Sequence, residues 1–350
     1  MSRVLVAMSG GVDSSVAAAL MLEAGHDVVG VTLKLWQGPS GEAPTAGCCT
    51  VSDAEDARRV AAQLDIPYYV LDYTDEFMGG VVDHFVSDYL AGATPNPCIE
   101  CNRTVKFSRL LDRASEFDCQ LLVTGHYART RQVGSGWELA RGVDRSKDQS
   151  YVLSMLGQAE LARVRFPVGE MTKAETRDLA ENLGLRTASK PDSQDICFVG
   201  PGGYRDFVRM RDPSAQRPGP IVDVDGAVLG LHNGVVDVTI GQRHGLGLAV
   251  GEPRYVVAID SASATVTVGR REDLGVEEIE VGQIAWVAGE EPASREMEVQ
   301  FRAHGESVPA AREGPMIRFR EIQYGVAPGQ TATLYDGERV LGGAVIRAAS

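Results

Sequence analysis

Apolar runs of strand length alternate with amphipathic segments over the first half of the chain. Residues 4–8, 28–33, 66–71 and 120–124 are mostly apolar, which predicts strands buried on both faces of a sheet. Residues 14–25, 52–64, 77–89, 107–114 and 173–183 repeat apolar side chains every three or four positions, which predicts helices. Ser52 and Glu55 form the expected capping box of the second helix. This alternation predicts an α/β fold with a doubly wound parallel sheet.

The pattern changes after about residue 205. Residues 221–226 have the alternation and the Asp-Gly turn of a hairpin. Short segments with Gly and Pro turns follow, at 255–259, 265–268, 296–301, 316–319, 331–335 and 340–346. Segments of this kind are typical of β-barrels and sandwiches. We therefore predict an α/β domain over 1–205, a small β-rich central domain over 206–280 and a C-terminal β-barrel over 281–350.

A glycine loop joins the first predicted strand to the first predicted helix. It reads Ser9-Gly10-Gly11-Val12-Asp13-Ser14-Ser15. Glycines let a backbone approach a phosphate, and the N–H groups of a first helical turn point at it. Neither G-x-x-x-x-G-K-[ST] nor G-x-G-x-x-G occurs here. The loop predicts an anion site of another type, at the carboxyl ends of the strands, where Leu33 and Gly125 also lie.

Six cysteines occur, and their spacing is informative. In an intracellular chain, spaced cysteines indicate catalysis or metal binding more than a disulfide framework. Cys98 and Cys101 form a C-x-x-C pair in what we expect to be a proline-stiffened loop between two helices. A closed zinc site needs four ligands, and no second C-x-x-C is present, so structural zinc is the weaker interpretation. Cys119 precedes a buried strand and is expected in the core, whereas the Cys48-Cys49 pair has no evident role.

Composition and charge fit a cytoplasmic globular protein. The 350 residues are 44% hydrophobic with a net charge of −14, and no apolar run reaches the length of a membrane helix. The start of the chain has no signal-peptide pattern. The overall charge does not suggest nucleic-acid binding, but residues 101–150 hold nine basic and six acidic side chains. A polyanion can dock on such a local face, although solvated surface arginines explain the window equally well.

Five motifs in one order identify a family resemblance. They are the loop 9–15, Asn96-Pro97-Cys98-x-x-Cys101-Asn102, Thr124-Gly125-His126-Tyr127-Ala128-Arg129, Lys147-Asp148-Gln149, and Asp192-Ser193-x-x-Ile196-Cys197-Phe198. Together they resemble the bacterial tRNA-specific 2-thiouridylases of the PP-loop ATP pyrophosphatase superfamily. Pro328-Gly329-Gln330 is similar to part of the C-terminal barrel of that family. The resemblance runs nearly from end to end.

The resemblance implies an ATP-dependent sulfurtransferase. Such an enzyme adenylates O2 of the wobble uridine in the anticodon loop of Glu-, Gln- and Lys-type tRNAs and replaces it with sulfur. The implied cofactors are ATP and Mg²⁺. The implied partners are tRNA and a persulfide donor such as a cysteine desulfurase or a sulfur relay protein. No association with a membrane is expected.

The site residues also follow from the resemblance. Cys101 would be the nucleophile and Cys197 the persulfide carrier, with a Cys101–Cys197 disulfide after turnover. ATP would lie against Ala7, Met8, Ser9, Gly10, Gly11, Val12, Asp13, Ser14, Leu33 and Gly125. Asp13 would bind magnesium or maintain the geometry of the loop. Asn96, Pro97 and Cys98 would lie at the target base. Further tRNA contacts would be His126, Lys147, Asp148, Gln149, Arg302, Ala303 and Gln330.

One departure from the family pattern leaves two chemical routes open. Many members have aspartate where Cys98 stands. Three thiols, Cys98, Cys101 and Cys197, could hold three irons of a [4Fe–4S] cluster and leave the fourth iron open. Alternatively, Cys98 assists a persulfide route. Two rival functions are another PP-loop enzyme, such as an amide-forming ligase, and a non-catalytic RNA-binding module with an inactive nucleotide loop.

Overall fold

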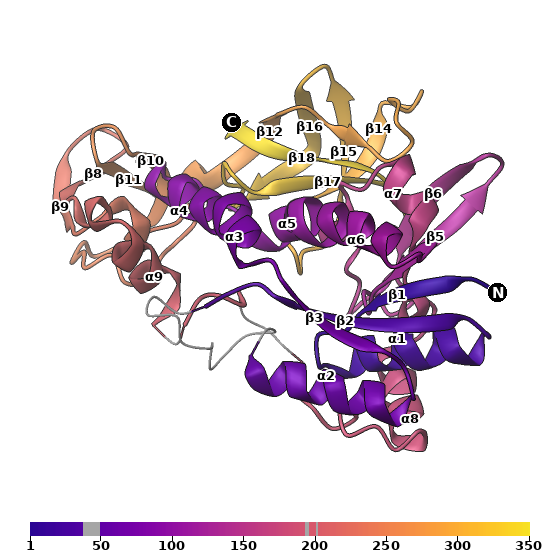
Figure 1. Ribbon diagram of the computed structural model, residues 1–350. Coiled ribbons are helices and arrows are strands. Elements are labelled where there is room, and N and C mark those ends of the chain that lie inside the picture. The colour runs from indigo at the N-terminus through magenta and orange to yellow at the C-terminus, as the bar shows by residue number, and fades with distance from the viewer. Residues whose placement is uncertain (38–49, 193–195, 201) are drawn as a thin grey trace.

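The computed structural model describes residues 1–37, 50–192, 196–200 and 202–350. Cys48 and Cys49, and residues 193–195 of the Cys197 motif, lie outside the described residues. Figure 1 shows a lower layer of parallel strands and helices, a β-rich lobe on the left and a barrel at the top. No described helix is long and apolar enough to cross a membrane.

The N-terminal domain is built on a parallel sheet, as the alternating pattern predicts. Within the described residues, five strands pair in the order β3-β2-β1-β4-β7. Val4 and Val6 of β1 face one apolar cluster and Leu5 faces the other, so the sheet is buried on both sides. The strands are β1 (Arg3–Ala7), β2 (Asp27–Lys34), β3 (Tyr68–Asp72), β4 (Leu121–Val123) and β7 (Val164–Arg165).

Helices cover both faces of this sheet (Figure 1). One face carries α1 (Val12–Glu23), α2 (Val51–Gln63) and α8 (Lys173–Asn182). The other face carries α3 (Thr74–Phe77), the π-helix η1 (Met78–Val82), α4 (Asp83–Leu90), α5 (Pro97–Cys101), the π-helix η2 (Asn102–Arg109) and α6 (Leu110–Glu116). The predicted capping box of α2 was wrong. Thr50 is the N-cap and Asp53 is its partner, because Thr50 lies one residue before the first helical turn.

The C-x-x-C pair lies on a helix, which corrects the predicted loop. Asn96 caps α5 by accepting a hydrogen bond of 3.1 Å from the Cys98 amide, and Pro97 occupies the first helical position. Proline is favoured there because its missing N–H has no helical partner in any case. Cys98 and Cys101 are therefore one helical turn apart, on one side of a short helix.

A hairpin that the pattern did not predict joins the N-terminal domain to the barrel. Strands β5 (Ala128–Val133) and β6 (Gly136–Arg141) pair with each other, and β6 pairs with β18 through Ala140–Arg339 and Leu139–Val340. The 3-10 turn η3 (Ser150–Leu153), α7 (Gln158–Arg163) and the 3-10 turn η4 (Pro167–Glu170) complete this region.

The second half of the chain is β-rich, as predicted. The central part contains α9 (Gly203–Arg211), the 3-10 turns η5 (Pro213–Gln216) and η6 (Val235–Asp237), the hairpin β8 (Gly219–Asp223) and β9 (Val228–His232), then β10 (Tyr255–Asp260), β11 (Thr265–Gly269) and the 3-10 turn η7 (Glu272–Leu274). The C-terminal part contains β12 (Gly275–Val281), β13 (Ala285–Trp286), β14 (Glu296–Gln300), β15 (Val308–Glu313), β16 (Met316–Tyr324), β17 (Thr331–Asp336) and β18 (Arg339–Ala349). Pairing of β12 with β18 closes a barrel in the order β12-β16-β15-β14-β17-β18. The boundary predicted at residue 280 falls inside β12.

Candidate active site

The loop between β1 and α1 is held tightly from two sides. Gly10 has a φ of 73°, and a Cβ there would overlap the Asp53 carbonyl oxygen. A Cβ on Gly125 would lie 2.6 Å from the Ser14 amide nitrogen and 2.7 Å from the Asp13 carbonyl carbon. Glycine is therefore required at both positions for backbone to pass this close.

Inside the loop, serine hydroxyls fix the turn. The Ser9 amide donates to Ser14 Oγ at 3.1 Å, and Ser15 Oγ donates to the Gly11 carbonyl at 2.8 Å. No side chain caps the N-terminus of α1. The amide groups of its first turn are consequently not taken by a cap, which is the arrangement found at helix N-termini that bind anions.

The remaining predicted nucleotide residues surround this loop. Ala7 ends β1, and Met8 accepts a 2.6 Å hydrogen bond from the Thr32 hydroxyl through its carbonyl. Leu33 is buried near the carboxyl end of β2. The predicted set is thus brought together at one edge of the sheet.

Two lysines that the sequence did not single out reach this loop. The Lys173 ammonium lies 2.7 and 2.9 Å from the two Asp13 carboxylate oxygens, and its side chain is only 11% exposed. The Lys190 ammonium donates to the Gly10 carbonyl at 2.9 Å and pairs with Asp53 and Asp56. Burial opposes its charge, but the hydrogen bonds to these carboxylates raise the pKa of Lys190. Both ammonium groups are thus held at the glycine loop.

Asp192 is the centre of an ion-pair cluster. Its carboxylate lies 2.8 Å from Lys147, Lys173 and Arg177. Burial alone would raise the pKa of Asp192, but the hydrogen bonds and charges of Lys147 and Lys173 lower it to about 2. Lys173 therefore bridges Asp13 of the glycine loop and Asp192 of the motif that contains Cys197.

A second path of hydrogen bonds leads from Asp13 toward Cys101. The Tyr127 hydroxyl donates to Asp13 Oδ1 at 2.8 Å, and Tyr127 N donates to Gln149 Oε1 at 3.0 Å. From the turn that follows Gln149, the Val152 carbonyl accepts a 2.9 Å hydrogen bond from the Asn102 side chain, next to Cys101. Burial raises the pKa of Tyr127, so its hydroxyl keeps its proton and remains a donor.

Cys101 and Cys197 pack against the same apolar cluster. Cys101 is 6% exposed, and Cys197 is partly buried at the edge of that cluster. The neighbouring Phe198 ring fixes the Cys197 segment, with centroids 5.5 Å from Phe77 and 5.1 Å from Phe85. Such aromatic contacts each contribute about 0.5 to 1.5 kcal/mol beyond burial. Cys119 is buried, as predicted.

Cys98 differs from Cys101 in its surroundings. It is exposed, one turn before the buried Cys101. Among the described residues, no three His, Cys, Asp or Glu side chains lie close enough together to hold a metal ion. The three thiols in this arrangement therefore do not fit an iron–sulfur cluster. A magnesium ion bound through Asp13 and nucleotide phosphates needs no such group, because Mg²⁺ is usually held by one or two carboxylates plus phosphate and water.

The predicted tRNA residues fall into two regions. His126 is partly buried, its Nδ1 lies 2.6 Å from Thr124 Oγ1, and burial together with the Lys106 charge lowers the pKa of His126 to about 3. The Asp148 carboxylate accepts hydrogen bonds from Arg141, the Gly142 amide and Ser150. Asp148 therefore shapes its loop from inside, whereas Lys147 is partly exposed at Asp192.

The other region is on the barrel. Arg302 is exposed and donates to the Tyr324 carbonyl, while the Gln300 side chain holds the Ala303 carbonyl at 3.2 Å. Gln330 Oε1 accepts from the Ala327 amide at 3.1 Å. The Thr94 amide donates to the Pro328 carbonyl at 2.8 Å, so the loop before Gln330 contacts the segment before Asn96.

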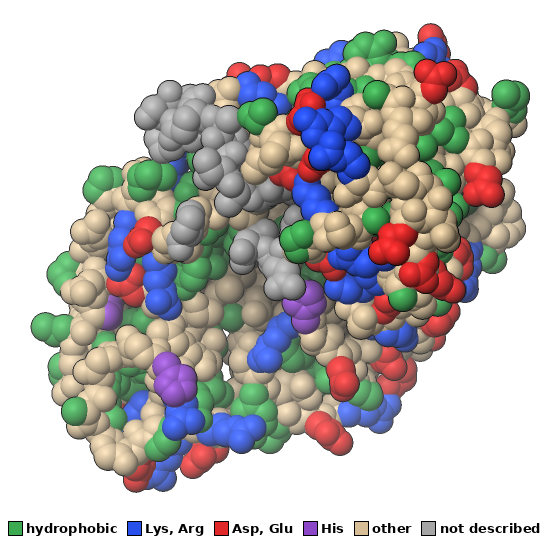
Figure 2. All heavy atoms as spheres, turned by 90° about the horizontal axis from the view of Figure 1, so that it is seen from below, with side chains coloured by type: hydrophobic (Ala, Val, Ile, Leu, Met, Phe, Trp, Pro, Cys, Tyr) green, Lys and Arg blue, Asp and Glu red, His purple; other side chains and the backbone are tan. Residues whose placement is uncertain are grey.

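The face that contains α2 and α8 is hollowed between the central lobe and the N-terminal domain. Figure 2 shows Lys and Arg side chains, interspersed with Asp and Glu, on both sides of this hollow.

Fold, loop and cations together define a nucleotide-binding α/β domain with two appended β-domains. The chain matches the family model described as the tRNA methyl transferase HUP domain over residues 2–201. It also matches the tRNA methyl transferase PRC-barrel domain over 205–270 and the aminomethyltransferase beta-barrel domain over 276–346. The predicted fold class is thereby confirmed.

Full-length relatives identify the family. The chain is 47% identical over 366 residues to a tRNA-specific 2-thiouridylase MnmA of Roseiflexus castenholzii, with 98% of each chain covered. It is 49% identical over 350 residues to that of Chloroflexus aggregans, again with 98% of each covered. The chain belongs to the tRNA-specific 2-thiouridylase family, which confirms the resemblance carried by the five motifs. A solved 4-thiouridine synthetase–RNA complex with bound ATP is similar with a TM-score of 0.37 and 18% identity, covering 61% of this chain and 51% of that one.

Proposed function

We propose that this enzyme uses ATP to replace O2 of the wobble uridine in tRNA with sulfur, in the cytoplasm. The relatives at 47–49% identity carry the name of this activity. The observation that carries the proposal is that two hydrogen-bonded paths leave Asp13, one through Lys173 and Asp192 and one through Tyr127 and Gln149. The first leads to the Cys197 motif and the second to the residue beside Cys101. Nucleotide chemistry and sulfur chemistry would then share one centre.

In the first step, ATP makes the uridine oxygen a leaving group. O2 of uracil attacks the α-phosphate, pyrophosphate leaves, and the oxygen departs later as part of AMP. The amides of the 9–14 loop and the ammonium groups of Lys173 and Lys190 would hold the pyrophosphate. Asp13 would bind the magnesium ion that accompanies the phosphates. Ala7, Met8, Leu33 and Gly125 would lie along the nucleotide.

In the second step, sulfur replaces AMP. A persulfide on Cys197, supplied by a cysteine desulfurase or a sulfur relay protein, attacks C2, and AMP leaves. The Cys101 thiolate then attacks the Cys197 sulfur. The S–S bond between Cys197 and the transferred sulfur breaks, a Cys101–Cys197 disulfide forms, and 2-thiouridine is released. A thiol reductant reopens the disulfide for the next cycle.

The target base must leave the anticodon loop to reach Cys101. Enzymes that act on bases commonly flip them out, at a cost of a few kcal/mol, and single-stranded loops make this easier. Asn96, Pro97 and the exposed Cys98 would meet the base. Because the pKa of His126 is about 3, His126 would contact RNA as a neutral imidazole.

The cluster route is less well supported. The described cysteines do not form a group that fits a metal, so no step is routed through a [4Fe–4S] cluster. Iron and sulfide analysis of anaerobically purified enzyme should give less than about 0.1 iron per chain at full activity; stoichiometric iron that activity requires would favour the cluster route.

The test is mass spectrometry of nucleosides from a Glu-, Gln- or Lys-type tRNA incubated with enzyme, ATP and a persulfide source. Wild-type enzyme should produce 2-thiouridine at the wobble position. Cys101→Ser and Cys197→Ser should produce none, while Cys119→Ala, a buried thiol outside the site, should remain active. Formation of 2-thiouridine at an unchanged rate by Cys101→Ser would overturn the proposal and favour another PP-loop reaction. Absence of tRNA-dependent pyrophosphate release from the wild type would favour a binding module without catalysis.

A further inference from the structure

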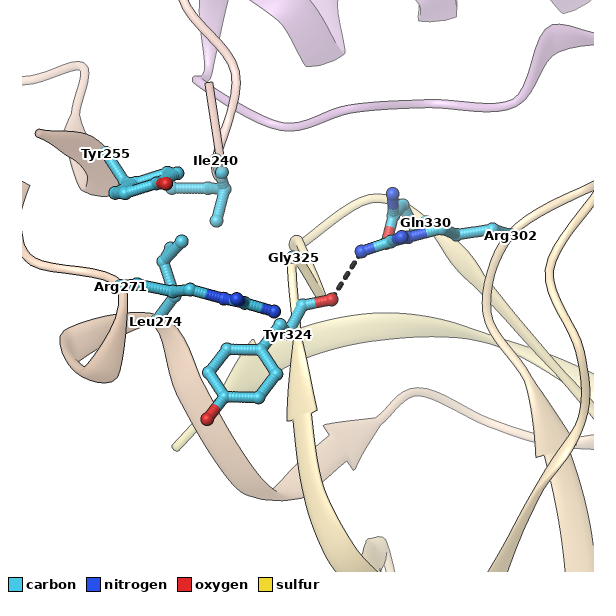
Figure 3. A pocket seen from close by; sticks show the side chains of 9 residues that line it. Ile240, Tyr255, Arg271, Leu274, Arg302, Tyr324, Gly325 and Gln330 are labelled. Carbon is cyan, nitrogen blue, oxygen red and sulfur yellow. Dashed lines mark hydrogen bonds between the residues drawn. The ribbon is translucent and has the colours of Figure 1, made fainter. Parts of the chain in front are cut away.

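A pocket lies between the central domain and the barrel. Its volume is about 360 Å³, within the range of about 300 to 1,000 Å³ typical of ligand sites. The central domain contributes Tyr255 and Arg271, and the barrel contributes Arg302, Tyr324 and Gln330. Figure 3 shows the Arg271 and Arg302 side chains pointing toward the Tyr324–Gly325 edge from opposite sides.

The two arginines give this pocket an unbalanced positive charge. Among the described residues, neither Arg271 nor Arg302 forms an ion pair with a carboxylate. The adjacent Arg270, in contrast, lies 3.5 Å from Glu252. Two guanidinium groups that face one pocket without a carboxylate form a site for an anion, and arginine matches the geometry of phosphate oxygens especially well.

Contacts within the pocket hold these groups in place. Arg302 donates one N–H to the Tyr324 carbonyl, which leaves most of its five donors available. The Arg271 guanidinium carbon lies 5.4 Å from the centre of the Tyr324 ring. The rings of Tyr324 and Tyr255 also offer flat surfaces of the kind on which RNA bases and riboses pack. The lining therefore suits a nucleotide unit better than a bare inorganic ion.

The pocket is also connected to the cysteine helix. Gln330 lines it, and the preceding Gly329 packs so closely on the N-terminal domain that a Cβ there would lie 2.8 Å from the Thr94 amide. Thr94 precedes Asn96, the cap of the helix that carries Cys98 and Cys101. A ligand in the pocket would thus be fixed relative to the reacting thiols through one short loop.

We propose that this pocket binds a backbone phosphate of the substrate tRNA between Arg271 and Arg302, with Tyr324 against the adjoining nucleotide. The inference rests on the proposed function, because it takes tRNA as the substrate. It adds Arg271 and Tyr324, on both sides of the domain junction, to the RNA-binding surface. A single RNA strand that spans the junction would fix the central domain against the barrel.

The experiment measures tRNA affinity as a function of salt concentration. Arg271→Gln should weaken binding about five- to tenfold at 100 mM salt and reduce the slope of log K against log salt by about one, as expected for one lost phosphate contact. Arg271→Lys should recover part of the loss. The matched control is Arg270→Gln, which removes a neighbouring exposed charge outside the pocket and should bind within twofold of wild type.

Two further measurements make the outcomes distinct. Circular dichroism and the urea midpoint confirm that Arg271→Gln is folded, and AMP titration tests whether a free nucleotide is the ligand. Saturable AMP binding that depends on Arg271, without loss of tRNA affinity, would overturn the inference, as would wild-type affinity and slope in Arg271→Gln. If the wild type thiolates tRNA in the same preparations, failure of the pocket prediction leaves the proposed function intact. If it binds tRNA with the predicted slope but makes no 2-thiouridine, the proposed function fails and the pocket stands.

Discussion

Replacing Gly125 with alanine tests whether the strand-end glycine sets the position of the nucleotide loop. The new Cβ would lie 2.6 Å from the Ser14 nitrogen and 2.7 Å from the Asp13 carbonyl carbon. An ordinary contact starts at 3.4 Å, so the loop must move by about 0.8 Å. Backbone atoms on both sides leave no flexible side chain to absorb this movement. Overpacking of this kind costs about 1 to 3 kcal/mol of stability.

The effect on catalysis should be larger than the effect on folding. A misplacement of about 1 Å can cost about 100-fold in rate, and we expect kcat/KM for tRNA-dependent pyrophosphate release to fall by that factor. The control is Gly79→Ala, an exposed helical position where a Cβ meets nothing within 4 Å. It should keep full activity and equal or slightly higher stability. A folded Gly125→Ala variant with kcat/KM within threefold of wild type would refute the steric argument.

Two further predictions concern charge. The depressed pKa of His126, about 3, means that the folded state resists protonation while the unfolded chain protonates near 6.5, so stability should fall as pH drops below 6.5. From pH 7 to pH 5, the urea-derived free energy of unfolding should therefore fall by about 2 kcal/mol more in the wild type than in His126→Gln. The control variant His244→Gln should behave as the wild type does. Parallel pH curves for all three proteins would contradict this prediction. At pH 7, the free energy of unfolding of Asp192→Asn should be about 1 to 2 kcal/mol lower than that of the wild type. The shift in the pKa of Asp192 from 3.8 to about 2 corresponds to roughly 2.5 kcal/mol, and solvent screening reduces this value. Since the folded pKa is the lower one, this contribution is complete above about pH 4 and is lost only as pH falls toward 2. Asp178→Asn, on the exposed side of α8, is the control. If both changes affect stability and thiolation equally, the Asp192 ion pairs are not responsible for the loss of stability.

The glycine loop was predictable because its signal is local. Strand, loop and helix cap are consecutive residues, and each residue type has a direct backbone consequence at its own position. The five predicted helical segments and most strands of both halves followed from periodicity in the same way, but the short helices α5, α7 and α9 did not. The start of α2 did not, because Ser52 and Glu55 satisfy the capping pattern as well as Thr50 and Asp53 do, and the pattern alone cannot choose between two overlapping registers.

The hairpin β5–β6 was missed for a different reason. Its strands carry Arg129, Arg131 and Glu138, so their apolar alternation is weak. They form because β6 completes a pairing with β18 of the barrel, about 200 residues away in the chain. A polar strand whose partner is this remote in sequence has no local signal, although Gly134-Ser135-Gly136 marks its turn.

Sequence patterns also did not identify the two lysines of the site. The burial of these lysines indicates why they are there. Lys173 and Lys190 meet their loop partners across 160 and 180 residues. Lys173, at 11% exposure, is costly to desolvate, and a buried ion pair is often no more stabilising than well-packed apolar residues of the same volume. Stability alone therefore explains this pair poorly. A phosphate group explains it better: an ammonium group already desolvated and aimed at the loop by Asp13 and Asp192 needs little rearrangement to meet pyrophosphate charge as it develops. The partners that hold Lys173 in the free enzyme are thus the residues that would direct it during catalysis.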